Sequence, residues 1–527
     1  MPPTEMISKK LKEILYFTVL LFFSVALNQY YGYLGINPID SFISFNSGFD
    51  ILNGYFPFKD YWTITGPFID FIQAIFFKIF GISWFSYILH ASIFNFIFAI
   101  SVFYTLHKFE LNVHYCFIYA FLVSVLAYPS AGTPYVDHHS SFLSIISIFC
   151  FILALKTSSK KYWFSLPILL GIAFLSKQTP AAYIVLLIVF LSIIYFIFNF
   201  SLKKITYGVL GSFFFIFTFV IIFLIAKISL LSFFQQYVLF PISLGESRLD
   251  FLFPLEFNRI ILRFKLLHLS SLLLIIVSIK KIIQDYKYLK TDEFLITVSL
   301  IGSSYALIIH QLMTVNGMFI FFIIPILAGF SHIYYLKYFK DKKYILYLLI
   351  FLSCASTVHY GIKYINSRDF MDLRKVNLKK SIDAKILSNK LNGLNWITVL
   401  YPDNPKEEIS RLLEVIKIIK NDTRKKTIVT DYQFISVILS TYDYSPNKYW
   451  YSFHAHPKKG TKYYETYKDF FINKLKDNEI EIAYTVKPLW GGDEVFEFDI
   501  DEKCFSKNEV TPILVTYLLK DCEELRK

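Results

Sequence analysis

A lysine interrupts two long apolar runs of this sequence, in the segment Phe174-Leu-Ser-Lys177-Gln-Thr-Pro180. An ammonium group at the centre of a membrane helix costs about 2.5–3.5 kcal/mol on insertion scales, so a lysine in such a place needs an explanation. At the rim of a membrane domain, its positive charge could bind a phosphate anion. The alternative is a side chain that snorkels to water and binds nothing.

A second polar group, Tyr135-Val-Asp137-His138-His139, stands directly before another apolar run. The carboxylate of Asp137 could orient Lys177, assist acceptor binding, hold a divalent ion or cap a helix. Adjacent histidines suggest a metal. Because the motif joins two apolar runs, polar packing at the membrane interface is the preferred interpretation of His138 and His139.

Other charged residues extend the set of candidates. Asp60 would either contact a sugar or shape a turn. Arg248, Arg259 and Arg263 lie in the long connection 230–264 and could supply a second phosphate contact or stabilise that connection. The full set of candidate substrate-binding residues is Asp60, Asp137, His138, His139, Lys177, Arg248, Arg259 and His310.

The chain that must position these residues is strongly apolar. It has 527 residues, of which 55 % are hydrophobic and 18 % charged, and its formal net charge is +13. Soluble domains are about 25 % charged, and residues 362–527 contain 53 of the charged residues, against 40 before them. We therefore predict a multi-pass membrane domain, residues 1–361, followed by a soluble domain, residues 362–527. The basic residues form short clusters between apolar runs, which argues against nucleic-acid binding.

The apolar runs predict transmembrane helices. A span needs about 20 apolar residues, and reading for such runs gives about eleven candidates, of which the fifth is short. The first is too long for the apolar part of a cleaved signal peptide. The candidate spans are 12–31, 84–106, 114–130, 140–156, 162–176, 180–200, 205–229, 265–282, 293–311, 317–336 and 343–361.

Basic residues set the expected orientation. About seventeen lysines flank one set of connections and about seven basic residues flank the other, so the first set is expected to be cytoplasmic. With an odd number of spans, the N-terminus is then cytoplasmic and the C-terminal domain extracytoplasmic. Asp40, Asp60 and Asp137 fall on the outer side, which is where a site is expected.

The C-terminal domain reads as a small α/β fold. Three short β-branched runs alternate with helix-like stretches, and no glycine-rich phosphate loop follows them, so nucleotide binding is not expected. The domain could contact substrate, dock a partner or support the loops. Cys504 and Cys522 could form a disulfide if it faces an oxidising compartment. The predicted strands are 396–401, 427–430 and 480–485, and the predicted helices are 406–420, 432–440 and 469–476.

The first outer loop, residues 32–83, carries a recognisable pattern: Asp40 after the first span, then Gly54, Pro57-Phe58, Asp60, Pro67-Phe68 and Phe80-Gly81. It resembles the loop of GT-C glycosyltransferases, in particular the group containing the aminoarabinose and protein-mannosyl transferases. Two positions differ conservatively, with Phe in place of Tyr and of Leu. Residues 67–80 are expected to form a helix along the membrane interface. Lys177, Asp137 and the segment 319–325 after the loop bearing His310 are similar to later family elements, so the resemblance covers about residues 10–335 and leaves the C-terminal domain unmatched.

The resemblance implies an inverting transferase that moves a sugar from a polyprenyl-phosphate carrier to an acceptor on the extracytoplasmic face of the membrane. The absence of organelle signals and the compact inner loops suggest a bacterial plasma membrane, although an endoplasmic reticulum enzyme would look similar. Asp40 would be the general base, if it reaches the nucleophile and has a suitable pKa; otherwise it is a solvated aspartate or a helix cap. Lys177 would stabilise the departing phosphate. The partners implied are a polyprenyl-phosphate sugar donor and a lipid, glycan or protein acceptor. No cofactor is required, although a divalent cation could bind.

Two other functions compete with this one. A transporter or flippase of lipid-linked saccharides would carry ionisable groups near mid-membrane and paired repeats. The sequence has no internal repeat, and its polar groups gather at one rim. A non-catalytic scaffold would leave that one-sided placement unexplained.

Overall fold

The computed structural model describes residues 3–253, 255–314, 320–450, 455–490, 492, 496–522 and 525. The chain divides into two compact units. The first, here called the bundle unit, comprises Met1–Gly32, Ala91–Phe219 and Ser247–Phe370. The second, the loop–domain unit, comprises Tyr33–His90, Val220–Glu246 and Met371–Lys527.

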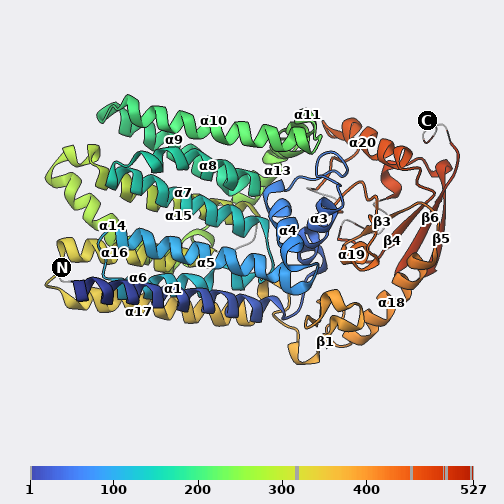
Figure 1. The fold of residues 1–527 in the computed structure, drawn as a ribbon, viewed down its shortest axis with the longest axis horizontal. Coiled ribbons are helices and arrows are strands. Elements are labelled where there is room, and N and C mark those ends of the chain that lie inside the picture. Colours follow the sequence, from blue (N-terminus) through green and yellow to red (C-terminus); the bar gives the residue numbers. More distant parts are fainter. Residues whose placement is uncertain are drawn as a thin grey trace. The chain divides into compact units, whose positions relative to one another are not determined.

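The apolar runs predicted to span the membrane are helical over most of their described residues (Figure 1). The first three residues of the predicted span 317–336 lie outside the described residues. Among the described residues, 10 segments are long and apolar enough to cross a membrane, so the chain is a multi-pass membrane protein. The helices are α1 (Pro3–Gly32), α5 (Trp84–Lys108), α6 (Val113–Leu126), α7 (Val136–Thr157), α8 (Lys160–Ser176), α9 (Gln178–Phe198), α10 (Leu202–Ile225), α14 (Lys265–Gln284), α15 (Asp292–Thr314), α16 (Ile323–Tyr338) and α17 (Lys343–Tyr360).

Helix α8 is the predicted span that is not among these 10 segments, whereas α6 and α16 reach the required length together with the turns Tyr128–Ser130 and Ile320–Phe322. The 17 residues of α8 rise about 26 Å at 1.5 Å per residue, against a hydrocarbon core about 30 Å thick. Lys177, at its C-terminal end, contacts Asp137 in the first turn of α7. Helix α8 therefore runs back along the length of α7, although it is shorter than a typical span.

Short helical turns join the long helices of the bundle unit. They are α13 (Gly245–Leu252, which begins in the loop–domain unit), η1 (Tyr128–Ser130), η3 (Asn258–Leu262), η4 (Tyr286–Lys290), η5 (Ile320–Phe322), η6 (Gly361–Asn366) and η7 (Asp369–Met371). Helix α7 is mostly buried, whereas α10 exposes apolar side chains along most of its length. Helix α7 is therefore central in the bundle unit, whereas the surface of α10 is suited to contact with lipid.

In the loop–domain unit, the first loop folds into α2 (Pro38–Ser41), α3 (Ile43–Leu52) and α4 (Pro67–Phe80). The bounds of α4 are those of the predicted interfacial helix. It starts with a proline at its first position and stops at Gly81, whose φ of +81° suits glycine. Helices α2 and α3 were not predicted. The segment 220–246 adds α11 (Leu230–Phe233), η2 (Phe234–Leu239) and α12 (Phe240–Ser243).

The C-terminal part of the loop–domain unit contains a four-stranded mixed sheet in the order β3-β4-β6-β5. Strands β3 (Lys426–Thr430) and β4 (Ile482–Val486) are parallel, while β6 (Leu514–Leu519) is antiparallel to β4 and to β5 (Phe505–Thr511). Helices α18 (Pro405–Asn421), α19 (Phe434–Leu439) and α20 (Tyr464–Asp477) accompany it, with the short turns η8 (Leu378–Lys380), η9 (Ala384–Ile386), η10 (Asn389–Leu391), η11 (Glu497–Asp499) and η12 (Glu502–Cys504). The predicted α/β fold is confirmed.

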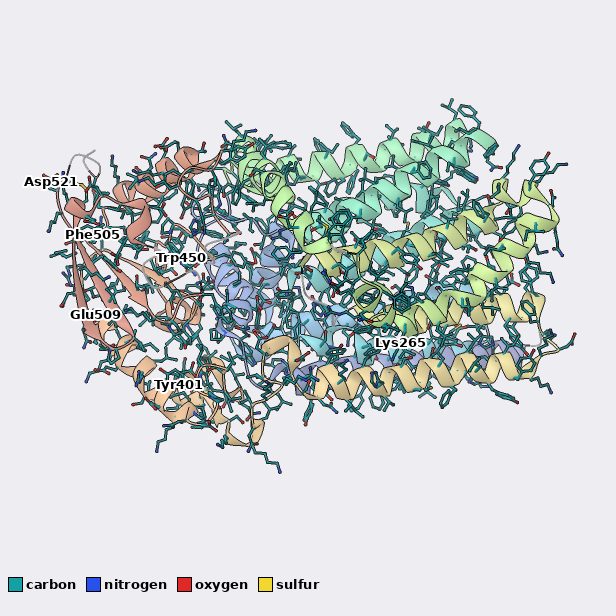
Figure 2. The ribbon with its side chains drawn as sticks, turned by 180° about the vertical axis from the view of Figure 1, so that it is seen from behind. Lys265, Tyr401, Trp450, Phe505, Glu509 and Asp521 are labelled. Carbon is teal, nitrogen blue, oxygen red and sulfur yellow. A yellow bond between two sulfur atoms is a disulfide. The ribbon has the colours of Figure 1, made fainter. Side chains whose placement is uncertain are left out.

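Two details of this domain differ from the prediction. Strand β2 is only Asn395–Trp396, paired with β1 (Ile382–Asp383), because the carbonyls of Asn395 and Ile397 accept instead from Gly35 and Ile36 of the first loop. The hairpin of β5 and β6 was missed, since β5 is an exposed edge strand with no apolar alternation. Its residues Phe505 and Glu509 lie at the margin of the domain (Figure 2). Cys504 and Cys522 form a disulfide.

Candidate active site

Three charged or ionisable side chains meet at one end of the bundle unit. The Lys177 ammonium donates to both carboxylate oxygens of Asp137, at 2.7 and 2.6 Å, and Nε2 of His310 lies 2.7 Å from Asp137 Oδ1. They come from the start of α7, the break between α8 and α9, and the last turns of α15. The side chains of Asp137 and His310 are 4 % and 1 % exposed, whereas that of Lys177 is 21 % exposed.

The backbone at Lys177 explains how a lysine comes to lie there. Its φ of −162° and ψ of 142° are extended, so the residue ends α8 and precedes α9 instead of continuing either helix. Its carbonyl accepts a hydrogen bond from Ser140 Oγ at 3.1 Å, which ties the break to α7. Among the described side chains, the Asp137 oxygens are the hydrogen-bond partners of the ammonium, which has three donors. Two of these three donors are thus engaged by Asp137.

Three arginines of the connection 230–264 are candidates for a second phosphate contact. The charge of Arg248 acts on His310 and Tyr183, which places Arg248 in electrostatic range of the cluster. Arg259 instead donates from Nη2 to the Phe251 carbonyl at 2.6 Å, a contact that stabilises its own connection. Arg263 is exposed.

The two histidines after Asp137 are fully buried. His138 Nε2 lies 2.7 Å from Ser130 Oγ, and His139 Nδ1 is hydrogen-bonded to the Tyr128 hydroxyl, so both side chains contact the turn η1. Within the described residues, no group of three or more His, Cys, Asp or Glu side chains could hold a metal ion. These contacts are those of buried polar packing.

Arg368 supports the same turn and was not identified from the sequence. It is fully buried, and its guanidinium donates to the carbonyls of Pro129 at 3.1 Å, Ser130 at 3.3 Å and Ala131 at 2.9 Å. It lies in a Ser-Arg-Asp stretch after the last span, where nothing in the sequence distinguishes it from a surface arginine.

Asp40 lies in the loop–domain unit, in the first turn of α2, and is half-buried. The charge of Asp40 acts on the hydroxyls of Tyr87 and Tyr449, so both hydroxyls lie within electrostatic range of the Asp40 carboxylate. The charge of Asp70 in α4 acts on the same two hydroxyls. Asp70 accepts a 3.1 Å hydrogen bond from Ser44, and burial raises its pKa to about 7.

Asp60 shapes the turn that follows α3. Its Oδ2 accepts from the backbone N–H of Phe56 at 2.8 Å, and its carboxylate lies 3.8 Å from Lys59 and 3.9 Å from Lys474. The structure thus brings Asp137, Lys177 and His310 together in the bundle unit and places Asp40 and Asp60 in the loop–domain unit.

Part of the chain is similar to a known protein family. Residues 65–226 match the sequence model of the family described as dolichyl-phosphate-mannose-protein mannosyltransferase. The matched range includes Asp137 and Lys177, while Asp40 lies before it. The match shows that this part of the chain is similar to that family, in agreement with the resemblance at Pro67-Phe68, Phe80-Gly81, Asp137 and Lys177, whereas Gly54 and Asp60 also lie before it.

Three similar solved structures come from two organisms. The Archaeoglobus fulgidus oligosaccharyltransferase complex with Zn and sulfate has 14 % identity and a TM-score of 0.43 over 89 % of this chain and 68 % of that chain. Archaeoglobus fulgidus AglB in complex with an inhibitory peptide and a dolichol-phosphate has 12 % identity and a TM-score of 0.44 over 91 % and 70 %. ArnT from Cupriavidus metallidurans bound to undecaprenyl phosphate has 10 % identity and a TM-score of 0.44 over 96 % and 97 %. No curated protein matches the chain.

Proposed function

We propose that this protein transfers a sugar from a polyprenyl-phosphate carrier to an acceptor on the extracytoplasmic side of the plasma membrane, with inversion at the anomeric carbon. The observation that carries the proposal is the Lys177 ammonium, fixed 2.6 Å from a buried aspartate and still partly exposed at one end of the bundle unit. A preorganised cation of this kind stabilises a phosphate as negative charge develops on it.

Asp40 is the proposed general base. A hydroxyl or amine of the acceptor attacks the anomeric carbon from the face opposite the phosphate, and Asp40 takes the proton that the nucleophile loses. The bond from the anomeric carbon to the phosphate oxygen breaks, and both its electrons leave with the polyprenyl phosphate. Because this anion is stable when paired with Lys177, the transfer needs neither a strong general acid nor a cofactor.

Two observations support an extracytoplasmic site. The end of the bundle unit that carries Asp137 and Lys177 is opposite the ends of α7 and α15 that adjoin the lysine-rich connections, and such connections are retained in the cytoplasm. The disulfide of Cys504 and Cys522 belongs in an oxidising compartment. The acceptor would be a lipid, a glycan or a protein exposed there.

The test is the variant Asp40→Asn in cells that lack the wild-type protein. Such cells should accumulate a polyprenyl-linked sugar, measured by mass spectrometry of extracted lipids. Wild type and the control Asp403→Asn, which changes an aspartate exposed in the C-terminal domain, should clear it, and Asp40→Asn should not, although it inserts normally. Near-normal turnover by Asp40→Asn would refute the assigned base.

Release of free polyprenyl phosphate distinguishes a transferase from a flippase, because only the transferase cleaves the donor. Purified protein in vesicles that contain donor and acceptor should release the carrier in proportion to the glycosylated product. Movement of intact donor between leaflets, with no carrier released, would contradict a chemical step.

A further inference from the structure

Helix α3 of the first loop carries two polar side chains that need partners. Asn46 and Asp50 are four residues apart and so lie on one face of the helix, and both are 0 % exposed. Burying a carboxylate without a counter-charge is very costly. Its partner must therefore be supplied by another part of the loop–domain unit.

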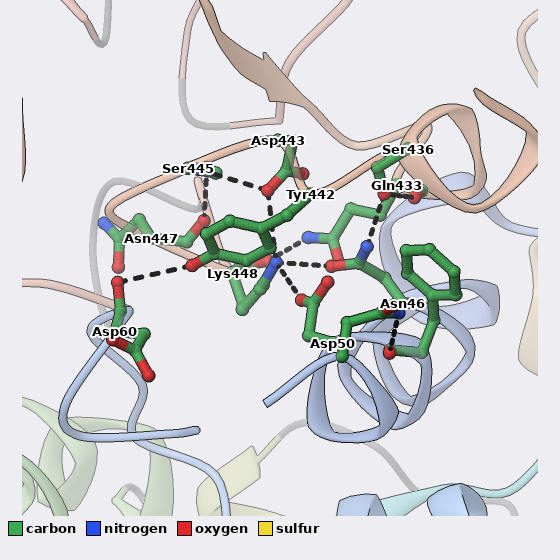
Figure 3. Close-up of polar contacts among 12 residues, drawn as sticks. Asn46, Asp50, Asp60, Gln433, Ser436, Tyr442, Asp443, Ser445, Asn447 and Lys448 are labelled. Carbon is green, nitrogen blue, oxygen red and sulfur yellow. Dashed lines mark hydrogen bonds and ion pairs between the residues drawn. The ribbon is translucent and has the colours of Figure 1, made fainter. Parts of the chain in front are cut away.

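Lys448 supplies that partner from the C-terminal domain. Its ammonium lies 2.6 Å from Asp50 Oδ2 and 3.5 Å from Asp443 Oδ1, and it donates to Asn46 Oδ1 at 2.5 Å (Figure 3). The lysine side chain is only 1 % exposed. The two carboxylates raise the pKa of Lys448 despite its burial, so the ammonium stays charged beside both carboxylates while it donates to Asn46.

The segment that carries Lys448, residues 441–450, has other attachments to the first loop. The backbone N–H of Trp62 donates to the Pro446 carbonyl at 2.8 Å, and the backbone N–H of Lys448 donates to the Trp62 carbonyl at 3.4 Å. The rings of Tyr55 and Tyr442 stack with centroids 3.5 Å apart. The same two parts of the chain are thus joined by backbone pairing, ring stacking and a buried ion cluster.

The elements joined by these contacts are connected to Asp40. Helix α2, which contains Asp40, adjoins α3 through Phe42, whose carbonyl accepts from the Asn46 N–H at 2.8 Å. At the end of the same segment, Tyr449 is hydrogen-bonded to Thr65 and lies in electrostatic range of Asp40. A shift of α3 would therefore move α2 as well.

We propose that Lys448 is a positioning residue of the transferase: through Asp50 and Asn46 it holds α3, and with it α2 and the carboxylate of Asp40, in the geometry that proton transfer needs. The C-terminal domain is on this account an integral part of the catalytic machinery and not an appended module. The inference rests on the proposed role of Asp40.

The first test compares Lys448→Met with wild type in the full-length protein in detergent. Hydrogen exchange of the backbone amides of residues 43–65 should accelerate about tenfold or more, because the ion cluster no longer closes the loop. The turnover number should fall about 100-fold, as expected when a reacting group is displaced by about 1 Å. The KM for the donor should stay within about twofold, since the phosphate contacts of Lys177 are unchanged.

Three further variants complete the design. Lys448→Arg, which keeps the charge, should recover part of the turnover. Lys425→Met, the control, removes an exposed lysine paired with Glu479 and should change neither exchange nor turnover. Asp50→Asn combined with Lys448→Met should exceed the single Lys448→Met variant in turnover by about threefold or more, because no unpaired carboxylate is then buried.

The outcomes are distinguishable. Normal exchange and normal turnover in Lys448→Met would overturn the proposal, as would a donor KM that rises while turnover is unchanged. If Lys448→Met does not fold, amide exchange and turnover are compared instead between the double variant, Asp50→Asn with Lys448→Met, and wild type. If exchange changes as expected but the wild-type protein transfers no sugar, the proposed function fails while the hold of Lys448 on the first loop stands.

Discussion

The phosphate-binding hypothesis depends on Lys177, because the side chains around its ammonium determine whether the charge is available to an anion. Asp137 and His310 are almost completely buried around it, whereas the lysine itself is partly exposed. A snorkelling lysine would extend to water without such partners. The observed arrangement keeps the ammonium in one place and leaves part of it open to an anion.

We expect Lys177→Met to lower kcat/KM for the donor about 100-fold, in line with the loss of one electrostatic contact in a transferase site. It should also destabilise the protein, since removing one member of a buried ion pair costs about 3–5 kcal/mol. Asp137→Asn together with Lys177→Met should regain stability but not activity. Thermal unfolding and donor titrations separate the two effects. Donor kinetics within threefold of wild type in Lys177→Met would contradict phosphate binding.

At the scale of elements, the turn η1 links two parts of the bundle unit that are far apart in sequence. Tyr128 and Ser130 of η1 contact His139 and His138, which directly follow Asp137 in α7. The carbonyls of η1 and of Ala131 point at Arg368, 237 to 239 positions further along the chain. Arg368 therefore sets the position of the turn, and the turn packs against the start of α7.

Arg368→Met should raise the donor KM about tenfold. The variant loses charge-assisted hydrogen bonds worth about 1.5–3 kcal/mol each, only part of which reaches the site. Arg368→Lys should give an intermediate value, because one ammonium cannot replace the planar fork. The matched control is Arg411→Met, which removes an arginine that pairs with Glu407 on the surface of α18 and should leave kinetics unchanged. An unchanged donor KM in Arg368→Met would show that η1 does not position Asp137.

The elements that could be predicted from the sequence are those whose signal is local. Long apolar runs predicted the spanning helices, and the proline and glycine at the two ends of α4 predicted its bounds. Helix α3 lacks such a signal, and Lys448 and Asn46 are 402 positions apart, so no local pattern could pair them. Arg368 is likewise defined by distant carbonyls. The part of the candidate site around Lys177 and Asp137 could therefore be predicted, because local sequence motifs mark it. The parts that depend on tertiary contacts between distant residues could not be predicted.

For the whole molecule, the short helix α8 decides the topology. With α8 counted, the spans are odd in number and the termini lie on opposite sides of the membrane; without it, the 10 candidate spans would put both termini on one side. Lys177 at the end of α8 contacts Asp137 at the start of α7. The last turn of α8 and the first turn of α7 therefore lie at the same end of the bundle unit. We therefore expect the C-terminal domain outside and the N-terminus inside.

Labelling of single cysteines with a membrane-impermeant reagent in intact cells tests this arrangement. In a background in which Cys354 is replaced by serine, Asp403→Cys in the C-terminal domain should be labelled from outside. Lys203→Cys, exposed in the first turn of α10, should react only after the membrane is opened. Labelling of both positions from outside would mean that the lysine-rich connections are not cytoplasmic. Protection of both in intact cells would place the C-terminal domain, and with it Lys448 and Asp40, in the cytoplasm, where no extracytoplasmic acceptor could reach the proposed base. The side of the membrane on which Asp403 lies therefore decides between the proposed transferase and an enzyme that acts from the cytoplasm.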